Sequence, residues 1–276
     1  MLTTFLRIAV ALLIGYVVVA VLAWRYQDKL AFPGPRQLLP SPAERGLRGE
    51  RVRVTASDGV TLYGWYLPPD SAVHDGRAPG LLWFYGNMET VAGLAPVFAA
   101  LKPAGFGLLI LDYRGYGESE GDPTEAGLYR DGEAAWAHLA GRPEIDAARI
   151  AIYGRSLGAA VALHVATSRR PVAVVLDSPF STAAEMAREH YWFLPQFLIR
   201  LSLNNLERAR QLDAPLLVFH GEDDRVAPIR MGRAVAAAGR AEQFVTLQDA
   251  GHNETYDAGG RKYREILHAF LREAVE

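Results

Sequence analysis

A serine between two glycines stands at position 156, in the run IAIYGRSLGAAVAL that covers residues 150–163. The residues before Ser156 are apolar, and the residues after it are rich in alanine. A Gly-x-Ser-x-Gly pattern between a strand and a helix exposes the serine hydroxyl in a sharp turn, at the positive end of the helix. We therefore predict that Ser156 is a nucleophile and that the Leu157 N–H faces the developing negative charge. A serine that merely caps the helix is the alternative.

A serine nucleophile needs a base, and the base needs an acid that orients it. Among the seven histidines, His252 lies in DAGHNETY, a loop after the last predicted strand, at the same sheet edge as Ser156. We predict that His252 is the base. The remaining histidines lie in predicted helices, in a polar loop, in the segment 178–212 or at a strand end: His138, His164, His268, His74, His190 and His220.

The acid should follow the strand predicted at 215–221, where the text HGEDDRVAP begins at position 220. Three neighbouring acids compete there: Glu222, Asp223 and Asp224. Asp177, at the end of the preceding predicted strand, is a further alternative. No pair of histidines has a metal-binding spacing, so the sequence predicts no metal site and no cofactor.

Alternating strands and helices must position these residues. Residues 51–56 and 60–67 alternate in polarity around Ser57-Asp58-Gly59, which is typical of a β-hairpin. Continuous apolar runs then indicate buried parallel strands at 81–85, 107–113, 149–154, 172–177 and 215–221, with a weaker one at 243–249. Helical segments are predicted at 91–102, 126–139, 156–168, 229–238 and 259–274. The fold class is therefore α/β, a mostly parallel doubly wound sheet with an antiparallel N-terminal hairpin.

One connection is longer than the others. Residues 178–212 include the apolar and aromatic run HYWFLPQFLIRLSL at 190–203. A plain crossover needs fewer residues, so we predict a short cap over the site. An ordinary crossover helix packed on the sheet is the alternative.

The N-terminus differs from the rest of the chain. Residues 8–24 are uncharged and apolar, and this run is long enough to span a bilayer. Trp24 ends the run, and Arg25, Tyr26 and Lys29 follow it. We predict an N-terminal transmembrane anchor at 1–28, a Pro-rich extended linker at 29–49 and the catalytic domain at 50–276. A signal peptide cleaved after VLA at 21–23 is the alternative. The basic residues after the span slightly favour a cytoplasmic domain, and a chain that begins near Gly46 is expected to fold.

Composition excludes several classes. The net charge is −2, so no basic surplus points to nucleic acid. The absence of cysteine excludes disulfides, thiolate zinc sites and a cysteine nucleophile. Nothing in the sequence indicates the oligomeric state.

Six motifs occur in an order that resembles the α/β-hydrolase superfamily: YGNMET, LDYRGYGESEG, YGRSLG, HGEDDRVAP, AGHN and the apolar N-terminus. The chain is most similar to its membrane-anchored, small-cap, serine aminopeptidase-like branch. The resemblance implies that Asp224 is the orienting acid, which gives the order Ser156, Asp224, His252. It also implies that the Asn87 N–H completes an oxyanion hole with the Leu157 N–H, although Tyr85 replaces the family's usual histidine before Gly86-Asn87.

The resemblance leads us to expect a membrane-anchored serine hydrolase that cleaves a carboxylic ester or thioester. Its partners would be a small-molecule or lipid-like acyl substrate and the membrane. A peptidase or amidase of the same fold, a non-catalytic membrane scaffold and a small-molecule receptor are the alternatives, because fold does not fix function.

Overall fold

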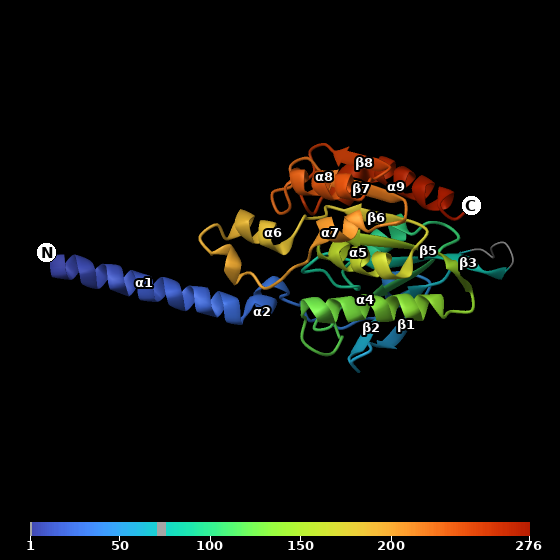
Figure 1. Ribbon diagram of the computed structural model, residues 1–276. Helices are drawn as coiled ribbons and strands as arrows, with labels where there is room; N and C mark the ends of the chain where they lie inside the picture. The colour runs from blue at the N-terminus through green and yellow to red at the C-terminus, as the bar shows by residue number, and fades with distance from the viewer. Residues whose placement is uncertain (1, 71–75) are drawn as a thin grey trace.

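In the computed structural model, residues 2–70 and 76–276 are described. One eight-stranded sheet forms the centre, in the order β1-β2-β4-β3-β5-β6-β7-β8 (Figure 1). The strands are β1 (Glu50–Thr55), β2 (Thr61–Leu67), β3 (Ala78–Phe84), β4 (Gly107–Leu111), β5 (Ile145–Arg155), β6 (Val174–Asp177), β7 (Leu216–Gly221) and β8 (Gln243–Leu247). β2 pairs antiparallel with β1 and β4, and all other pairs are parallel. The predicted fold class is thus confirmed, including the antiparallel start.

Helices cover both faces of the sheet. α4 (Glu125–Ala140), α5 (Leu157–Arg169), α7 (Asn205–Arg210) and α8 (Ile229–Ala238) pack side by side on one face. α3 (Ala95–Leu101) and α9 (Thr255–Glu273) contact each other on the opposite face. Every residue of β3 and β4 is buried between these layers, which explains the continuous apolar runs. α9 begins earlier than predicted because Gly260, at φ 48°, joins two helical pieces across a kink.

The long connection between β6 and β7 contains two different parts. α6 (Ala183–His190) and a short 3-10 turn at Gln196–Leu198 project beside the N-terminal helix, away from the sheet (Figure 1). α7 then returns and packs against α5 and α8 as a crossover helix does. The segment therefore contains both a short cap, formed by α6 and the 3-10 turn, and a crossover helix, α7. We call residues 183–203 the cap.

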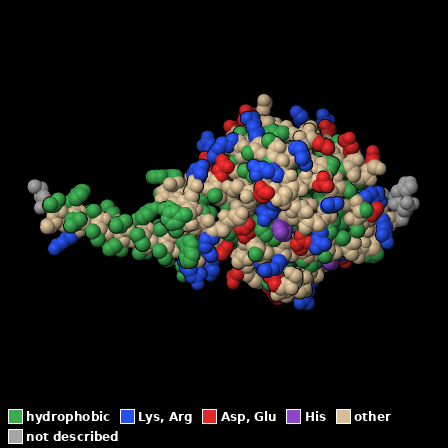
Figure 2. All heavy atoms as spheres, in the orientation of Figure 1, with side chains coloured by type: hydrophobic (Ala, Val, Ile, Leu, Met, Phe, Trp, Pro, Cys, Tyr) green, Lys and Arg blue, Asp and Glu red, His purple; other side chains and the backbone are tan. Residues whose placement is uncertain are grey.

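The N-terminal helix α1 (Leu2–Arg25) extends from the body of the protein (Figure 1). Its 24 residues have a mean hydropathy of 2.6 in the most apolar stretch, and only Ala20 is buried. Figure 2 shows hydrophobic side chains along this helix and around its junction with the body. By length and composition α1 is able to span a membrane, and a signal sequence has the same properties.

The segment predicted as a linker at 29–49 begins with the end of a helix and includes a 3-10 turn at Ala43–Arg45, and it packs closely against the domain. α2 (Gln27–Ala31) follows α1, and beyond it Phe32 and Leu39 are each only 2% exposed. The Trp65 indole N–H donates to Pro40 O, and the Gly117 N–H donates to Pro35 O. A chain that begins near Gly46 would lose these buried groups. We therefore predict that a chain that begins near residue 26 is more stable than one that begins near Gly46.

A buried carboxyl lies at the end of β4. Asp112 is 1% exposed, and its Oδ1 accepts hydrogen bonds from the Tyr85 hydroxyl (2.9 Å) and the Val91 N–H (2.8 Å). Burial raises the pKa of Asp112 from 3.8 to about 6, although these two hydrogen bonds oppose the shift. Between pH 3.8 and about pH 6, the folded chain therefore keeps a proton on Asp112 that the unfolded chain has lost.

This shift predicts a pH dependence of stability. As the pH rises from about 4 to about 6, the free energy of unfolding should fall, because the folded state must give up a proton that the unfolded state has already lost. Asp112→Asn should remove this part of the dependence, whereas the exposed Asp213→Asn should keep it. Chemical denaturation at several pH values measures the slope. Equal slopes in the wild type and Asp112→Asn would contradict the assignment.

Candidate functional site

Ser156 lies in the turn between β5 and α5. Its backbone has φ 49° and ψ −112°, a left-handed conformation that is costly for a residue with a side chain. Both flanking glycines are sterically required. A Cβ on Gly158 would overlap the carbonyl oxygen of Phe84, and one on Gly154 would meet Gly158 O at 2.6 Å. The sequence pattern therefore reflects close backbone packing, which fixes a strained turn with the serine at its apex.

Three predicted site residues meet at the carboxyl ends of the parallel strands. His252, in the loop after β8, has its Nε2 2.8 Å from Ser156 Oγ. Its Nδ1 is 2.7 Å from Oδ2 of Asp224, which follows β7. The hydroxyl, the imidazole and the carboxylate thus form one continuous hydrogen-bonded line, although they come from three separate loops. This geometry allows the imidazole to accept a proton from the hydroxyl.

The Asp224 carboxylate is held from several sides. Its Oδ1 accepts the N–H groups of Val226 (2.9 Å) and Ala227 (2.8 Å), and the side chain is buried. Burial alone would raise the pKa of this carboxyl, but hydrogen bonds from His220 and His252 outweigh it and hold the pKa well below its usual range. Asp224 therefore stays ionised throughout the neutral and mildly acidic range, as an acceptor for the imidazole must.

His220, near the end of β7, contacts the loop that carries Asp224. The ring is fully buried, with Nε2 2.8 Å from Ala227 O and 3.3 Å from Asp224 Oδ2. Nε2 must carry the proton, since both neighbours are acceptors. His220 thus supports the loop that holds Asp224 and approaches the same carboxylate oxygen as His252.

The two predicted oxyanion donors border the same cavity as Ser156. Leu157 begins α5, and Asn87 lies in the loop after β3. Gly158 brings the start of α5 against the backbone of Phe84 and Tyr85, which sets this loop beside the helix end. The Tyr85 ring points into the core, where its hydroxyl donates to Asp112 and accepts the Tyr113 N–H (3.1 Å). Tyr85, which stands where the family usually has a histidine, therefore supports the Asn87 loop from the side of the core.

The Asn87 side chain ties this loop to the N-terminal segment. Its amide nitrogen donates to the carbonyl oxygen of Ala31 at the end of α2 (2.8 Å). Its Oδ1 accepts the Tyr116 hydroxyl (2.6 Å) and the N–H of Met88 (3.1 Å). The residues next to the membrane-anchor candidate therefore help to position a predicted oxyanion donor, which the sequence did not indicate.

An ion pair that the sequence analysis did not predict connects the loops of the site. Arg155, directly before Ser156, is 2% exposed and pairs with Glu89. The same guanidinium donates to His252 O (2.7 Å) and Asn253 Oδ1 (2.9 Å). Glu89 in turn accepts the Gly86 N–H (2.6 Å), next to Asn87. Arg155 and Glu89 thus hold the loops that carry His252 and Asn87 at fixed positions relative to Ser156.

We predict that Arg155→Met lowers kcat on a short ester by about 10²-fold with little change in KM, because a small displacement of His252 disrupts proton transfer. Arg155→Lys should be intermediate, since one ammonium cannot replace the forked guanidinium. Arg233→Met, on the exposed side of α8, is the matched control. Steady-state kinetics gives the comparison. A KM effect alone, or equal activity in Arg155→Met and the wild type, would exclude a positioning role.

The alternative acids lie elsewhere. Asp223 is exposed, and only its backbone N–H, bonded to Ala250 O, takes part in the loop. Asp177 is buried beneath the turn, where its Oδ2 accepts hydrogen bonds from Tyr153, Tyr263 and Thr255. The Asp177 carbonyl oxygen accepts the Ser156 N–H (2.9 Å). Asp177 therefore supports the turn and does not approach the imidazole.

The other histidines do not converge on Ser156. His164 stacks on Tyr129, and His268 lies against Leu101 O. His138 is half-buried on α4, and His74 lies outside the described residues. His190 borders the cavity, but its Nε2 is 2.7 Å from Val226 O. Within residues 2–70 and 76–276, no three His, Asp or Glu side chains are arranged to hold a metal ion.

Comparisons with known proteins agree with this fold. Residues 80–205 match the family model described as serine aminopeptidase, S33. An uncharacterized protein of Mycobacterium tuberculosis is 38% identical over 256 residues, which cover 91% of this chain and 89% of that protein. The alpha/beta hydrolase domain-containing protein WAV2 of Arabidopsis thaliana is 32% identical, covering 90% and 88%. The solved esterase Pf2001 of Pyrococcus furiosus superposes with a TM-score of 0.72 at 21% identity, covering 87% and 98%.

Proposed function

Because this chain belongs to the α/β-hydrolase superfamily, we propose that it is a membrane-anchored serine hydrolase that cleaves a carboxylic ester or thioester. The observation that carries the proposal is the hydrogen-bonded line from Ser156 Oγ through His252 to Asp224, with distances of 2.8 and 2.7 Å. A scaffold that had lost catalysis would have no need of a strained serine at this point.

In the proposed reaction, Ser156 Oγ attacks the substrate carbonyl carbon as its proton passes to His252 Nε2. The bond from that carbon to the leaving oxygen or sulfur breaks, and His252 returns the proton to the departing alcohol or thiol. Water then gives a proton to His252 and attacks the acyl-enzyme, which releases the carboxylic acid and restores the serine. Asp224 accepts the Nδ1–H bond throughout and stabilises the imidazolium.

The negative charge on the carbonyl oxygen needs donors that are already in position. We propose the backbone N–H groups of Asn87 and Leu157, which border the cavity next to Ser156. Leu157 also begins α5, so the helix dipole favours the same charge. No cofactor takes part in this sequence of steps.

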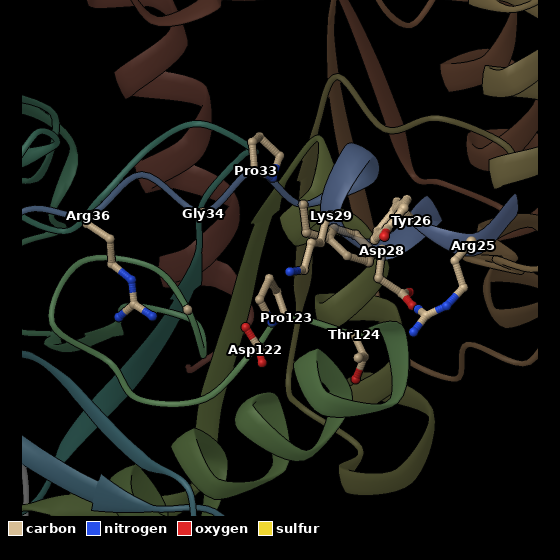
Figure 3. Close-up of a pocket in the computed structure, with 12 residues that line it drawn as sticks. Arg25, Tyr26, Asp28, Lys29, Pro33, Gly34, Arg36, Asp122, Pro123 and Thr124 are labelled. Atoms are coloured by element: carbon tan, nitrogen blue, oxygen red, sulfur yellow. The ribbon is translucent and has the colours of Figure 1, made fainter. Parts of the chain in front are cut away.

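The anchoring part of the proposal rests on α1 and on the residues that follow it. Trp24 and Tyr26 suit the membrane interface, and Arg25 and Lys29 suit its aqueous side. A hollow of about 500 Å³ lies at this end of the body. Arg25, Lys29 and Arg36 border it, together with Asp28 and Asp122 (Figure 3). The basic residues outnumber those before the span, which favours a cytoplasmic domain. Retention of the full chain in membranes under alkaline carbonate would support an anchor, and processing near residue 24 would replace it with a signal peptide.

A peptidase or amidase is the second candidate, favoured by the family description serine aminopeptidase. The two are separated by assaying the purified full chain against carboxylic esters of graded acyl length, thioesters and aminoacyl amides. We expect ester and thioester turnover to exceed amide turnover. Faster amide cleavage would favour the peptidase, and no turnover of any substrate would favour the scaffold or the receptor.

A further inference from the structure

An apolar cavity of about 540 Å³ opens beside Ser156, within the size range of small-ligand sites. Three separate parts of the chain form its wall. The N-terminal helices contribute Val19, Ala23 and Leu30, the cap contributes Met186 and Leu194, and the domain contributes Phe180. The cavity that holds the proposed nucleophile is therefore closed on one side by the candidate membrane anchor itself.

The anchor helix is fixed to the cap by specific contacts. The Tyr16 hydroxyl donates to Phe193 O (2.9 Å), and the Arg200 guanidinium lies 5.1 Å from the Trp24 ring centroid. The buried Gln27 donates from Nε2 to Leu198 O (3.0 Å) and accepts the N–H groups of residues 200 and 201 at its Oε1. These contacts hold the Val19 and Ala23 face of α1 against the cavity.

The position of Val19 along α1 sets the depth of this wall. If Trp24 lies at the membrane interface, Val19 lies roughly 8 Å further into the bilayer, at about 1.5 Å per residue. Tyr16, which contacts the cap, lies about 12 Å beyond Trp24 by the same rise. One end of the cavity therefore reaches the level of the lipid acyl chains.

The outer surface of the cap is also suited to lipid. Trp192 is 83% exposed and Phe197 is 85% exposed, with Tyr191 and Phe193 half exposed next to them. These rings lie on the cap, which projects beside α1 (Figure 1), and Figure 2 shows hydrophobic side chains gathered over the same junction. Such a patch is unfavourable in water and favourable among lipid headgroups and upper acyl chains. The cap and α1 thus present one continuous apolar surface to the bilayer.

We infer that an acyl chain of a bilayer lipid ester enters between α1 and the cap and lies against Val19 and Ala23, with its carbonyl carbon at Ser156. This inference rests on the proposed serine hydrolase function and names its substrate class. The N-terminal helix then has two roles, since it anchors the enzyme and forms part of its acyl-binding wall.

Substitutions on α1 test this arrangement in the full chain, in phosphatidylcholine vesicles. Val19→Phe and Ala23→Phe narrow the cavity, whereas Val18→Phe adds the same ring one position away, on the lipid-facing side of the helix. We expect the two cavity variants to lower the ratio of palmitoyl-ester to acetyl-ester hydrolysis roughly tenfold or more, because overpacking excludes a long chain. Val18→Phe should leave both rates unchanged.

The outcomes separate the inference from the function on which it rests. An unchanged ratio in Val19→Phe and Ala23→Phe, or an equal fall in Val18→Phe, would overturn the acyl wall while leaving the hydrolase intact. A long-chain ester cleaved equally fast as a dissolved monomer and in vesicles would overturn uptake from the bilayer. A wild type that cleaves neither ester would overturn both the hydrolase and the acyl wall.

Discussion

Ser156→Ala and His252→Ala should each lower kcat on a short ester by about 10³-fold or more, and the double variant should be little worse than either single one. The reason is that Ser156 Oγ and His252 Nε2, 2.8 Å apart, are proposed to act as one nucleophilic unit. Once either is removed, the other has no partner with which to react. Only the proposed oxyanion donors, the N–H groups of Asn87 and Leu157, remain.

Steady-state and single-turnover kinetics on the three variants measure this effect. Ser168→Ala, at the exposed end of the same helix α5, is the matched control and should retain full activity. Additive losses in the double variant would mean that the two residues contribute independently. An active Ser156→Ala would assign the nucleophile elsewhere.

Asp224→Asn should lower kcat by up to about 10⁴-fold, because an amide cannot hold the imidazole in the tautomer that accepts the serine proton. Asp223→Asn, one residue earlier, should change little, since the Asp223 side chain is exposed and only its backbone takes part in the loop. The two variants make the same chemical change at neighbouring positions. They therefore form a matched pair.

Thermal unfolding of both variants accompanies the kinetics, because Asp224 Oδ1 also holds the N–H groups of Val226 and Ala227. A folded Asp224→Asn variant with normal kcat would refute the assignment. In that case Asp177 would not be a ready substitute, since its carboxylate accepts hydrogen bonds from Tyr153, Tyr263 and Thr255 beneath the turn.

The sequence predicted the sheet and the Ser156 turn well because both depend on local patterns. Buried parallel strands need continuous apolar runs, and close packing around Gly154 and Gly158 permits no side chain. The choice among Glu222, Asp223 and Asp224 needed the family resemblance, because three adjacent acids have the same local pattern. The structure distinguishes Asp224 from its two neighbours, because the Asp224 carboxylate accepts the backbone N–H groups of Val226 and Ala227.

Two features were not predictable in this way. Arg155 occupies a variable position of the Gly-x-Ser-x-Gly pattern, and its partner Glu89 is 66 residues away in the chain. A charged residue at the end of a buried strand was the available signal. The linker at 29–49 was predicted from proline composition, which does not report packing. Phe32 and Leu39, two large apolar residues in a segment assigned as a linker, were the sign that it lies against the domain.

Intact-mass analysis after treatment with a fluorophosphonate tests whether Ser156 is the nucleophile. The reagent transfers its phosphonyl group to an activated serine oxygen as fluoride leaves, so no knowledge of the natural substrate is needed. We expect one adduct on the wild-type chain, mapped to Ser156, and none on Ser156→Ala. Equal labelling of both proteins, or an adduct on a different serine, would contradict it.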